Sequence, residues 1–173
     1  SYSYEWLSRH VNRCGNALKS LGLGMEQRVL MIMLDTVDFP GVFLGAIKIG
    51  AVPVPLNTLL TADDYAFMLR DSRARMLVVS AALFDKVKPA LENQPWLETV
   101  LIAGGAAGGY PALDKLAARA ADRLAPAATT CDDPAFWLYS SGSTGTPKGA
   151  VHVQSSLVQT AELYAQQIGR AYV

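Results

Sequence analysis

Apolar residues recur with helical spacing near the start of the chain. Steps of three and four residues place one apolar stripe on a helix, at Leu7, Val11, Cys14, Leu18 and Leu21. Two glycines follow closely and end the pattern. The spacing therefore predicts an amphipathic helix in which Cys14 is a small buried hydrophobe.

Short continuous apolar runs then alternate with helical patterns along the rest of the chain. Strands buried on both faces are predicted at residues 29–34, 75–79 and 99–102. Helices are predicted at residues 39–47, 61–69, 85–92 and 113–124. Alternating strands and helices imply right-handed crossovers between parallel strands. The predicted fold class is α/β, with a largely parallel sheet and flanking helices.

Three local signals refine this prediction. Asp35 and Thr36 follow the first strand, and we expect them to cap the next helix. The two prolines in residues 51–55 allow an edge strand at most. Thr61 and Asp64 have the spacing of a capping box, which explains the acidic pair Asp63–Asp64 better than paired catalytic carboxylates do.

Composition narrows the classes of function. The chain has 173 residues, 51% of them hydrophobic and 17% charged, which suits about one globular domain. A net charge of zero without runs of like charge argues against nucleic acid as a partner. The apolar stretch 41–56 is interrupted and too short to span a membrane, and the N-terminus has no signal-peptide pattern. Cys14 and Cys131 lack metal-ligand spacing, so we expect no metal site and a reduced, cytoplasmic setting.

A loop rich in glycine and hydroxyl residues follows the aromatic strand 136–139. Its glycines allow a ligand to approach the backbone, its hydroxyl groups donate hydrogen bonds, and its lysine brings one positive charge. The candidate phosphate-binding residues are Ser140, Ser141, Gly142, Ser143, Thr144, Gly145, Thr146 and Lys148. The P-loop pattern needs Gly-Lys followed by Ser or Thr, whereas Lys148 lies between Pro147 and Gly149. An ADP-forming phosphotransferase or NTPase is thus a disfavoured alternative.

Residues 139–149 resemble the phosphate-binding signature of the adenylate-forming superfamily, which contains acyl- and aryl-CoA ligases, luciferases and adenylation domains. Residues 48–57 are similar to the block upstream of that signature, and residues 4–21 resemble the helix before it. The resemblance covers nearly the whole chain. Within the superfamily, residues 34–40, 57–65 and 160–164 look most like benzoate–CoA ligases.

The resemblance implies an AMP-forming reaction in two steps. An aromatic carboxylate attacks the α-phosphate of MgATP, and coenzyme A then displaces AMP from the acyl-adenylate. By this analogy the loop holds the β- and γ-phosphates of ATP, with Thr144 and Thr146 as hydroxyl contacts and Lys148 as the cation. Tyr164 would approach the aryl pocket, while His152 is not assigned to catalysis. A homodimer is compatible with the resemblance.

The resemblance also implies that residues 1–173 are part of a large N-terminal AMP-binding domain. The superfamily's magnesium-binding Glu, ribose-binding Asp and C-terminal domain lysine have no counterpart here. We therefore assign no catalytic residue and expect the piece alone to be inactive. Two alternatives stay open: another acyl-CoA ligase or adenylation domain, and a non-catalytic binding or interaction module.

Overall fold

The central element is a four-stranded parallel sheet. The computed structural model describes residues 2–140 and 145–164. The strands are β1 (Arg28–Ile32), β2 (Val52–Pro55), β3 (Met76–Ser80) and β4 (Thr99–Ala103), in the order β2-β1-β3-β4. Each neighbouring pair is parallel. The α/β prediction is confirmed, and the proline-containing β2 is an edge strand of this sheet as expected.

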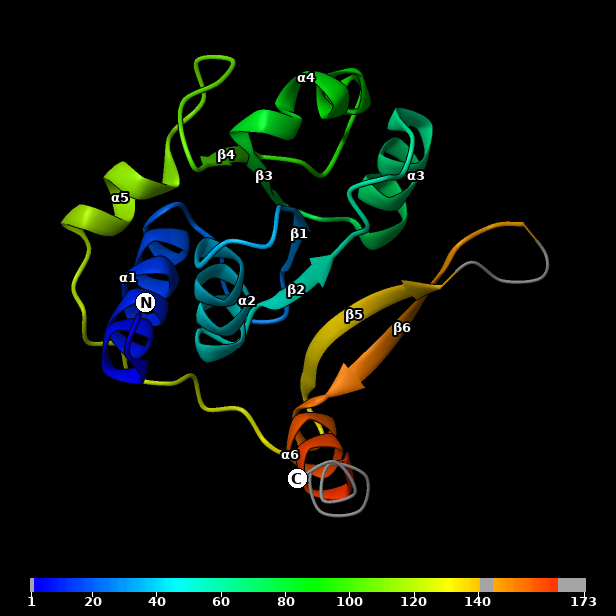
Figure 1. The fold of residues 1–173 in the computed structure, drawn as a ribbon. Coiled ribbons are helices and arrows are strands. Elements are labelled where there is room, and N and C mark those ends of the chain that lie inside the picture. The colour runs from blue at the N-terminus through cyan, green and yellow to red at the C-terminus, as the bar shows by residue number, and fades with distance from the viewer. Residues whose placement is uncertain (1, 141–144, 165–173) are drawn as a thin grey trace.

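Helices cover both faces of the sheet (Figure 1). One layer contains α1 (Tyr4–Ser20), α2 (Asp38–Lys48) and α5 (Leu113–Arg119). The other contains α3 (Ala62–Ser72) and α4 (Phe84–Val87), with 3-10 turns at residues 81–83 and 88–91. Side chains alternate between the two layers: Val29 and Met31 pack under α1 and α2, whereas Leu30 and Ile32 pack under α3. This two-sided burial explains why the strands are continuous apolar runs.

The structure confirms one predicted helix cap and contradicts another. Thr61 and Asp64 form the capping box of α3, in which each side chain bonds the other residue's backbone N–H. The expected cap of α2 at Asp35 and Thr36 is wrong. Its N-cap is Val37, which makes no side-chain hydrogen bond, because a tight turn in which the Thr36 N–H donates to the Leu34 carbonyl at 2.8 Å delays the helix.

Helix α5 is shorter than the apolar spacing predicted, since it ends at Arg119 and not near Leu124. The next carbonyl groups bond to side chains of α1 instead of to a continuing helix. Asn12 donates to the Asp122 carbonyl at 2.8 Å, and Asn16 donates to the carbonyls of Ala121 and Arg123. Leu124 still packs against the core cluster under α1 and α2. The apolar position was therefore predicted correctly and its conformation was not.

An antiparallel hairpin projects from this three-layered body (Figure 1). It comprises β5 (Pro134–Ser140) and β6 (Lys148–Val153), and α6 (Gln154–Leu163) follows. β5 runs beside the edge strand β2. Its side chains alternate: Phe136 contacts Phe43 of α2 at a ring separation of 5.5 Å, whereas Trp137 and Tyr139 pack on the α3 side. The parallel-sheet prediction did not foresee this pairing.

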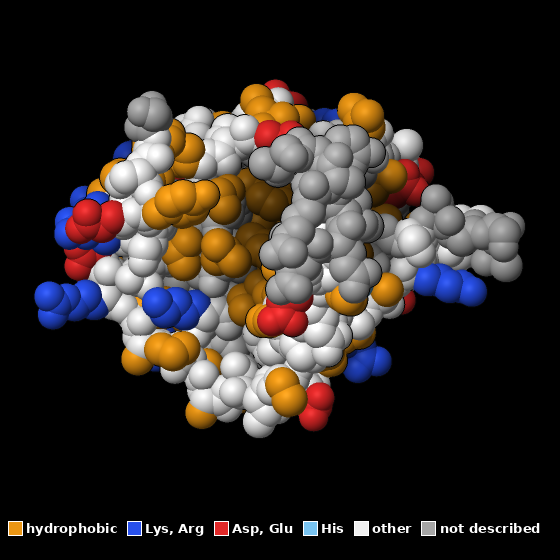
Figure 2. Space-filling model, turned by 60° about the horizontal axis from the view of Figure 1, so that its bottom comes forward, with side chains coloured by type: hydrophobic (Ala, Val, Ile, Leu, Met, Phe, Trp, Pro, Cys, Tyr) orange, Lys and Arg blue, Asp and Glu red, His pale blue; other side chains and the backbone are white. Residues whose placement is uncertain are grey.

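Hydrophobic side chains gather around a hollow on the side of the molecule that Figure 2 brings forward. Val151 of the hairpin and Val158 and Leu163 of α6 are each more than half exposed. Within the described parts of the chain, no helix is both long and apolar enough to cross a membrane.

Candidate phosphate-binding site

The hairpin brings the two ends of the predicted phosphate-binding loop together. In the β5–β6 ladder Ser140 is paired with Lys148, and Tyr139 with Gly149. Ser140, Thr146 and Lys148 are all exposed, so their polar groups are accessible to a ligand. Residues 141–144, which include the predicted contacts Ser141, Gly142, Ser143 and Thr144, lie outside the described residues.

Two glycines of the loop have separate structural roles. Gly145 has a φ of +84°, a left-handed conformation that strains residues with a side chain. Gly149 lies across the ladder from Tyr139, and a Cβ there would be 3.4 Å from the rings of both Trp137 and Tyr139. The two aromatic rings therefore lie in ordinary contact distance of this position of β6.

Two hollows lie against β5 of the hairpin, and the smaller one reaches its loop end. The smaller, ≈ 180 Å³, is lined by Pro55, Leu56, Asn57, Leu60, Met68, Tyr139, Ser140 and Pro147. The larger, ≈ 320 Å³, is lined by Met33, Leu34, Asp35, Phe39, Pro55, Leu56, Asn57, Thr58 and Leu138. The wall they share, residues 55–57, follows the carboxyl end of β2. Ligands of open α/β sheets commonly bind beyond the carboxyl ends of the strands, which is where the larger hollow lies.

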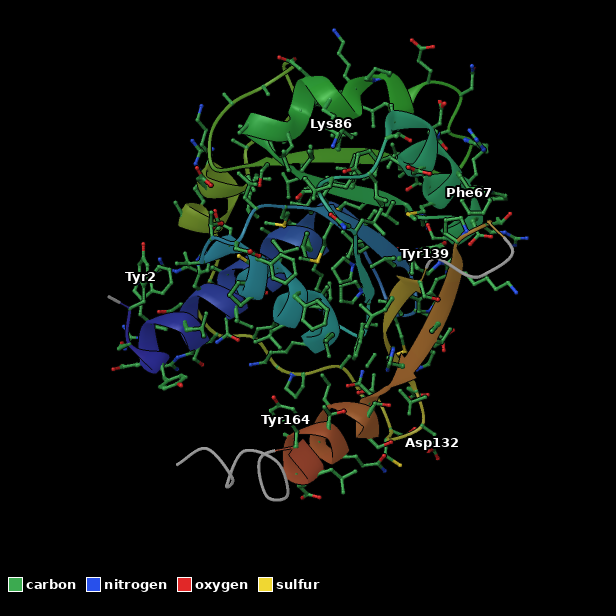
Figure 3. All side chains as sticks on the ribbon, turned by 45° about the vertical axis from the view of Figure 1, so that its right-hand side comes forward. Tyr2, Phe67, Lys86, Asp132, Tyr139 and Tyr164 are labelled. Carbon is green, nitrogen blue, oxygen red and sulfur yellow. The ribbon has the colours of Figure 1, made fainter. Side chains whose placement is uncertain are left out.

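One hydrogen bond connects β5 to helix α3, and Figure 3 shows Tyr139 on β5 beside that helix. The Tyr139 hydroxyl donates to Asp71 Oδ2 at 2.5 Å. Burial, together with the hydrogen bond to Asp71 and its negative charge, raises the pKa of Tyr139 well above that of an exposed phenol. The Arg28 guanidinium lies 5.8 Å from the centre of the Trp137 ring and donates from Nε to the Ser72 carbonyl at 2.7 Å.

The two remaining residues singled out by sequence lie away from the loop ends. The ring of His152 stacks on Phe136 at 4.5 Å, which fits a packing role. Tyr164 caps the end of α6 and is 62% exposed, on the far side of the hairpin from Tyr139 (Figure 3). The described residues do not bring Tyr164 together with the loop ends, and its role in an aryl pocket stays a prediction.

The two cysteines differ in their exposure to solvent. Cys14 is fully buried, and burial together with the nearby carboxylates of Asp38 and Asp114 raises its pKa to about 12. Cys131 is exposed. In residues 2–140 and 145–164, no three His, Cys, Asp or Glu side chains are grouped as metal ligands would be.

Sequence reasoning missed Asp71, Arg28 and Asn57. Asp71 lies 68 residues before its partner Tyr139, and no local pattern connects the two. Arg28 begins a buried strand, so its contact with Trp137 depends on the hairpin position. Asn57 lies in the block 48–57, but no pattern singles it out. Its backbone carbonyl accepts a hydrogen bond from the Tyr65 hydroxyl at 2.9 Å.

Comparisons with known proteins match the whole described fold. A family model described as "AMP-binding enzyme" matches residues 1–172. The benzoate–CoA ligase of Thauera aromatica is 53% identical over 169 residues, which make up 97% of this chain and 32% of that protein. The chain thus spans about a third of the length of this relative.

Solved structures give the same match. A benzoate–CoA ligase from Burkholderia xenovorans LB400 superposes with a TM-score of 0.86 at 43% identity, over 97% of this chain and 32% of its own. An anthranilate–CoA ligase solved in complex with anthranoyl-AMP superposes with a TM-score of 0.90 at 34% identity, over 94% of this chain and 32% of its own.

Proposed function

Because the chain belongs to the AMP-binding enzyme family, we propose that the protein containing it joins an aromatic carboxylate to coenzyme A with formation of AMP. The observation that carries this proposal is 53% identity to a benzoate–CoA ligase over nearly the whole chain. The anthranilate–CoA ligase solved with anthranoyl-AMP supports an acyl-adenylate as the intermediate. Benzoate is the first acid to test.

We propose that the loop between β5 and β6 binds the β- and γ-phosphates of ATP. The support is the pairing of Ser140 with Lys148 at the loop ends, with both side chains exposed. The Lys148 ammonium supplies positive charge, and the hydroxyls of Ser140 and Thr146 supply hydrogen-bond donors. One lysine neutralises only part of the negative charge of the phosphates. A magnesium ion bound to the phosphates would neutralise more of that charge.

The chemistry assigns these donors a role in bond breaking. When the carboxylate attacks the α-phosphate, the bond to pyrophosphate breaks and negative charge grows on the departing oxygens. Donors fixed before the reaction stabilise that charge without reorganising, and removing one donor typically costs about 3 kcal/mol of barrier. Coenzyme A would then react with the adenylate, for which the described residues supply no catalytic group.

The test is product analysis on the full-length gene product with benzoate, ATP, magnesium and coenzyme A. The proposal predicts equal amounts of AMP, pyrophosphate and benzoyl-CoA. Formation of ADP would favour the phosphotransferase class. Activity with other acids but not benzoate would favour another acyl-CoA ligase, and a lack of ATP turnover would favour a non-catalytic binding module. A cytoplasmic location and a homodimer belong to the same proposal.

Lys148→Ala tests the loop separately from the overall reaction. We expect a loss of about 100-fold in kcat/KM for ATP, as for other removed transition-state donors. Lys115→Ala is the matched control, because Lys115 is an exposed lysine on α5, distant from the hairpin. Equal activity of the two variants would remove Lys148 from the mechanism.

A further inference from the structure

A contact between β5 and α3 lies next to the loop ends. We propose that Tyr139, held by the Asp71 carboxylate, is a positioning residue that fixes Ser140 and Lys148 for binding the phosphates of ATP. The inference rests on the proposed function, because it assumes that the loop binds phosphate. It adds two residues, Tyr139 and Asp71, that would act through the loop and not by touching the substrate.

The contact between Tyr139 and Asp71 lies at the loop end of the hairpin. Tyr139 directly precedes Ser140, and its ladder partner Gly149 directly follows Lys148. A two-stranded hairpin is marginally stable alone, so its position depends on side chains that attach it to the rest of the fold. Among the side-chain hydrogen bonds of the described residues, the one from Tyr139 is the nearest to the loop that reaches another element.

The hydrogen bond between these two residues is a strong one. The 2.5 Å separation of the Tyr139 oxygen and Asp71 Oδ2 is typical of a hydroxyl donating to an ionised carboxylate. A tyrosine phenol is protonated at neutral pH, and the raised pKa of Tyr139 keeps the donor present in alkaline solution as well. Such charge-assisted bonds are about twice as strong as neutral ones.

Further contacts hold both Tyr139 and helix α3 in place. The Tyr139 ring lies against β6, at contact distance from the position of Gly149. Helix α3 is held by its capping box and by the buried side chains of Tyr65, Met68 and Leu69. A second tie joins the end of α3 to β5, because Arg28 bonds the Ser72 carbonyl and lies over Trp137. The contact therefore links a firm helix to the loop.

The arrangement predicts a specific kinetic effect of removing the hydroxyl. Tyr139→Phe keeps the ring and its packing but loses the bond to Asp71. Losing a hydrogen bond to a charged group corresponds to about a tenfold change in an equilibrium. We therefore expect kcat/KM for ATP to fall about tenfold in the full-length gene product, while KM for benzoate stays unchanged.

A double-mutant cycle identifies the partner. Asp71→Asn should lower kcat/KM for ATP in the same way, and the variant carrying both changes should be no worse than either single one. Tyr4→Phe is the matched control, since Tyr4 is 92% exposed at the start of α1. Additive losses in the double variant would overturn the pairing of Tyr139 with Asp71.

Two further outcomes would overturn the positioning role. One is a kcat/KM for ATP in Tyr139→Phe within about twofold of the unchanged protein. The other is an equal loss in the ATP and benzoate parameters, which would indicate a merely structural contact. A benzoate KM that stays constant while the ATP parameter falls supports the proposal.

Failure of the proposed function would be recognised separately. If the unchanged protein does not turn over ATP with benzoate, the ligase proposal fails, and backbone hydrogen exchange then decides the present one without any substrate. Tyr139→Phe should speed exchange in the β5–β6 ladder at residues 149–152 and leave residues 29–32 of β1 protected. Unchanged exchange in the ladder would overturn the proposed fixing of the loop ends.

Discussion

Helices α1 and α2 cross with their backbones in contact at Gly15 and Gly45. A Cβ at Gly45 would lie 2.8 Å from the Gly15 nitrogen and 2.9 Å from the Val11 carbonyl oxygen. Both obstructing atoms are helix backbone, and neither can rotate away as a side chain could. Gly45→Ala should therefore push α1 away from α2 and from the core beneath them.

The expected destabilisation follows from two opposing effects. Overpacking a well-packed interface costs about 1–3 kcal/mol, and rigid backbone neighbours favour the upper end of that range. Alanine recovers about 1 kcal/mol through its higher helix propensity. We expect a net loss of about 2 kcal/mol, a large share of the ~5–15 kcal/mol that stabilises a typical domain.

Urea unfolding of the variant and the unchanged protein measures this loss as a shift of the midpoint at constant slope. Gly24→Ala is the matched control, because a Cβ there would meet only the Gln27 side chain, at 3.7 Å. The control should unfold within about 0.5 kcal/mol of the unchanged protein. Equal stability of Gly45→Ala and Gly24→Ala would refute the close crossing of α1 and α2.

Two other predictions concern ionisable groups. The hydrogen bonds from Thr61 lower the pKa of Asp64, so its carboxylate adds stability above its ordinary pKa that is lost as the pH falls through the lowered value. Asp64→Asn should thus lower the thermal midpoint at pH 7 and have no effect in strong acid. Asp63→Asn, a change outside the capping box, should have little effect at either pH. A loss of stability in Asp64→Asn that does not depend on pH would contradict this prediction. Buried Cys14, with its pKa near 12, should resist thiol reagents in the native protein while exposed Cys131 reacts, as peptide mapping by mass spectrometry would measure. Equal labelling rates would show that Cys14 is accessible.

The sequence predicted the elements of the body because each one has a strong local pattern. The apolar run Val29–Leu34 indicates a strand without information from other parts of the chain. The pair Thr61 and Asp64 likewise indicates the start of a helix from local spacing alone. The two errors have different causes. Helix α5 ends early because Asn12 and Asn16, more than 100 residues earlier, bond the carbonyls that follow it. Helix α2 begins late because of a turn that its residue types did not indicate.

The family and the loop were predictable for a different reason. Residues 139–149 form a compact motif, and the comparisons confirm the family that it indicated. The hydrogen bond between Tyr139 and Asp71 was not predictable, because the two residues meet only once the hairpin lies beside β2. Phosphate binding by residues 140–148 stays a prediction.

The central claim is that the full-length protein activates an aromatic acid as its adenylate. The most direct measurement is the exchange of labelled pyrophosphate into ATP without coenzyme A, since exchange reports reversible adenylate formation alone. We expect pyrophosphate exchange that depends on benzoate and falls strongly in Lys148→Ala. ATP turnover to ADP and phosphate with no benzoate-dependent exchange would contradict it.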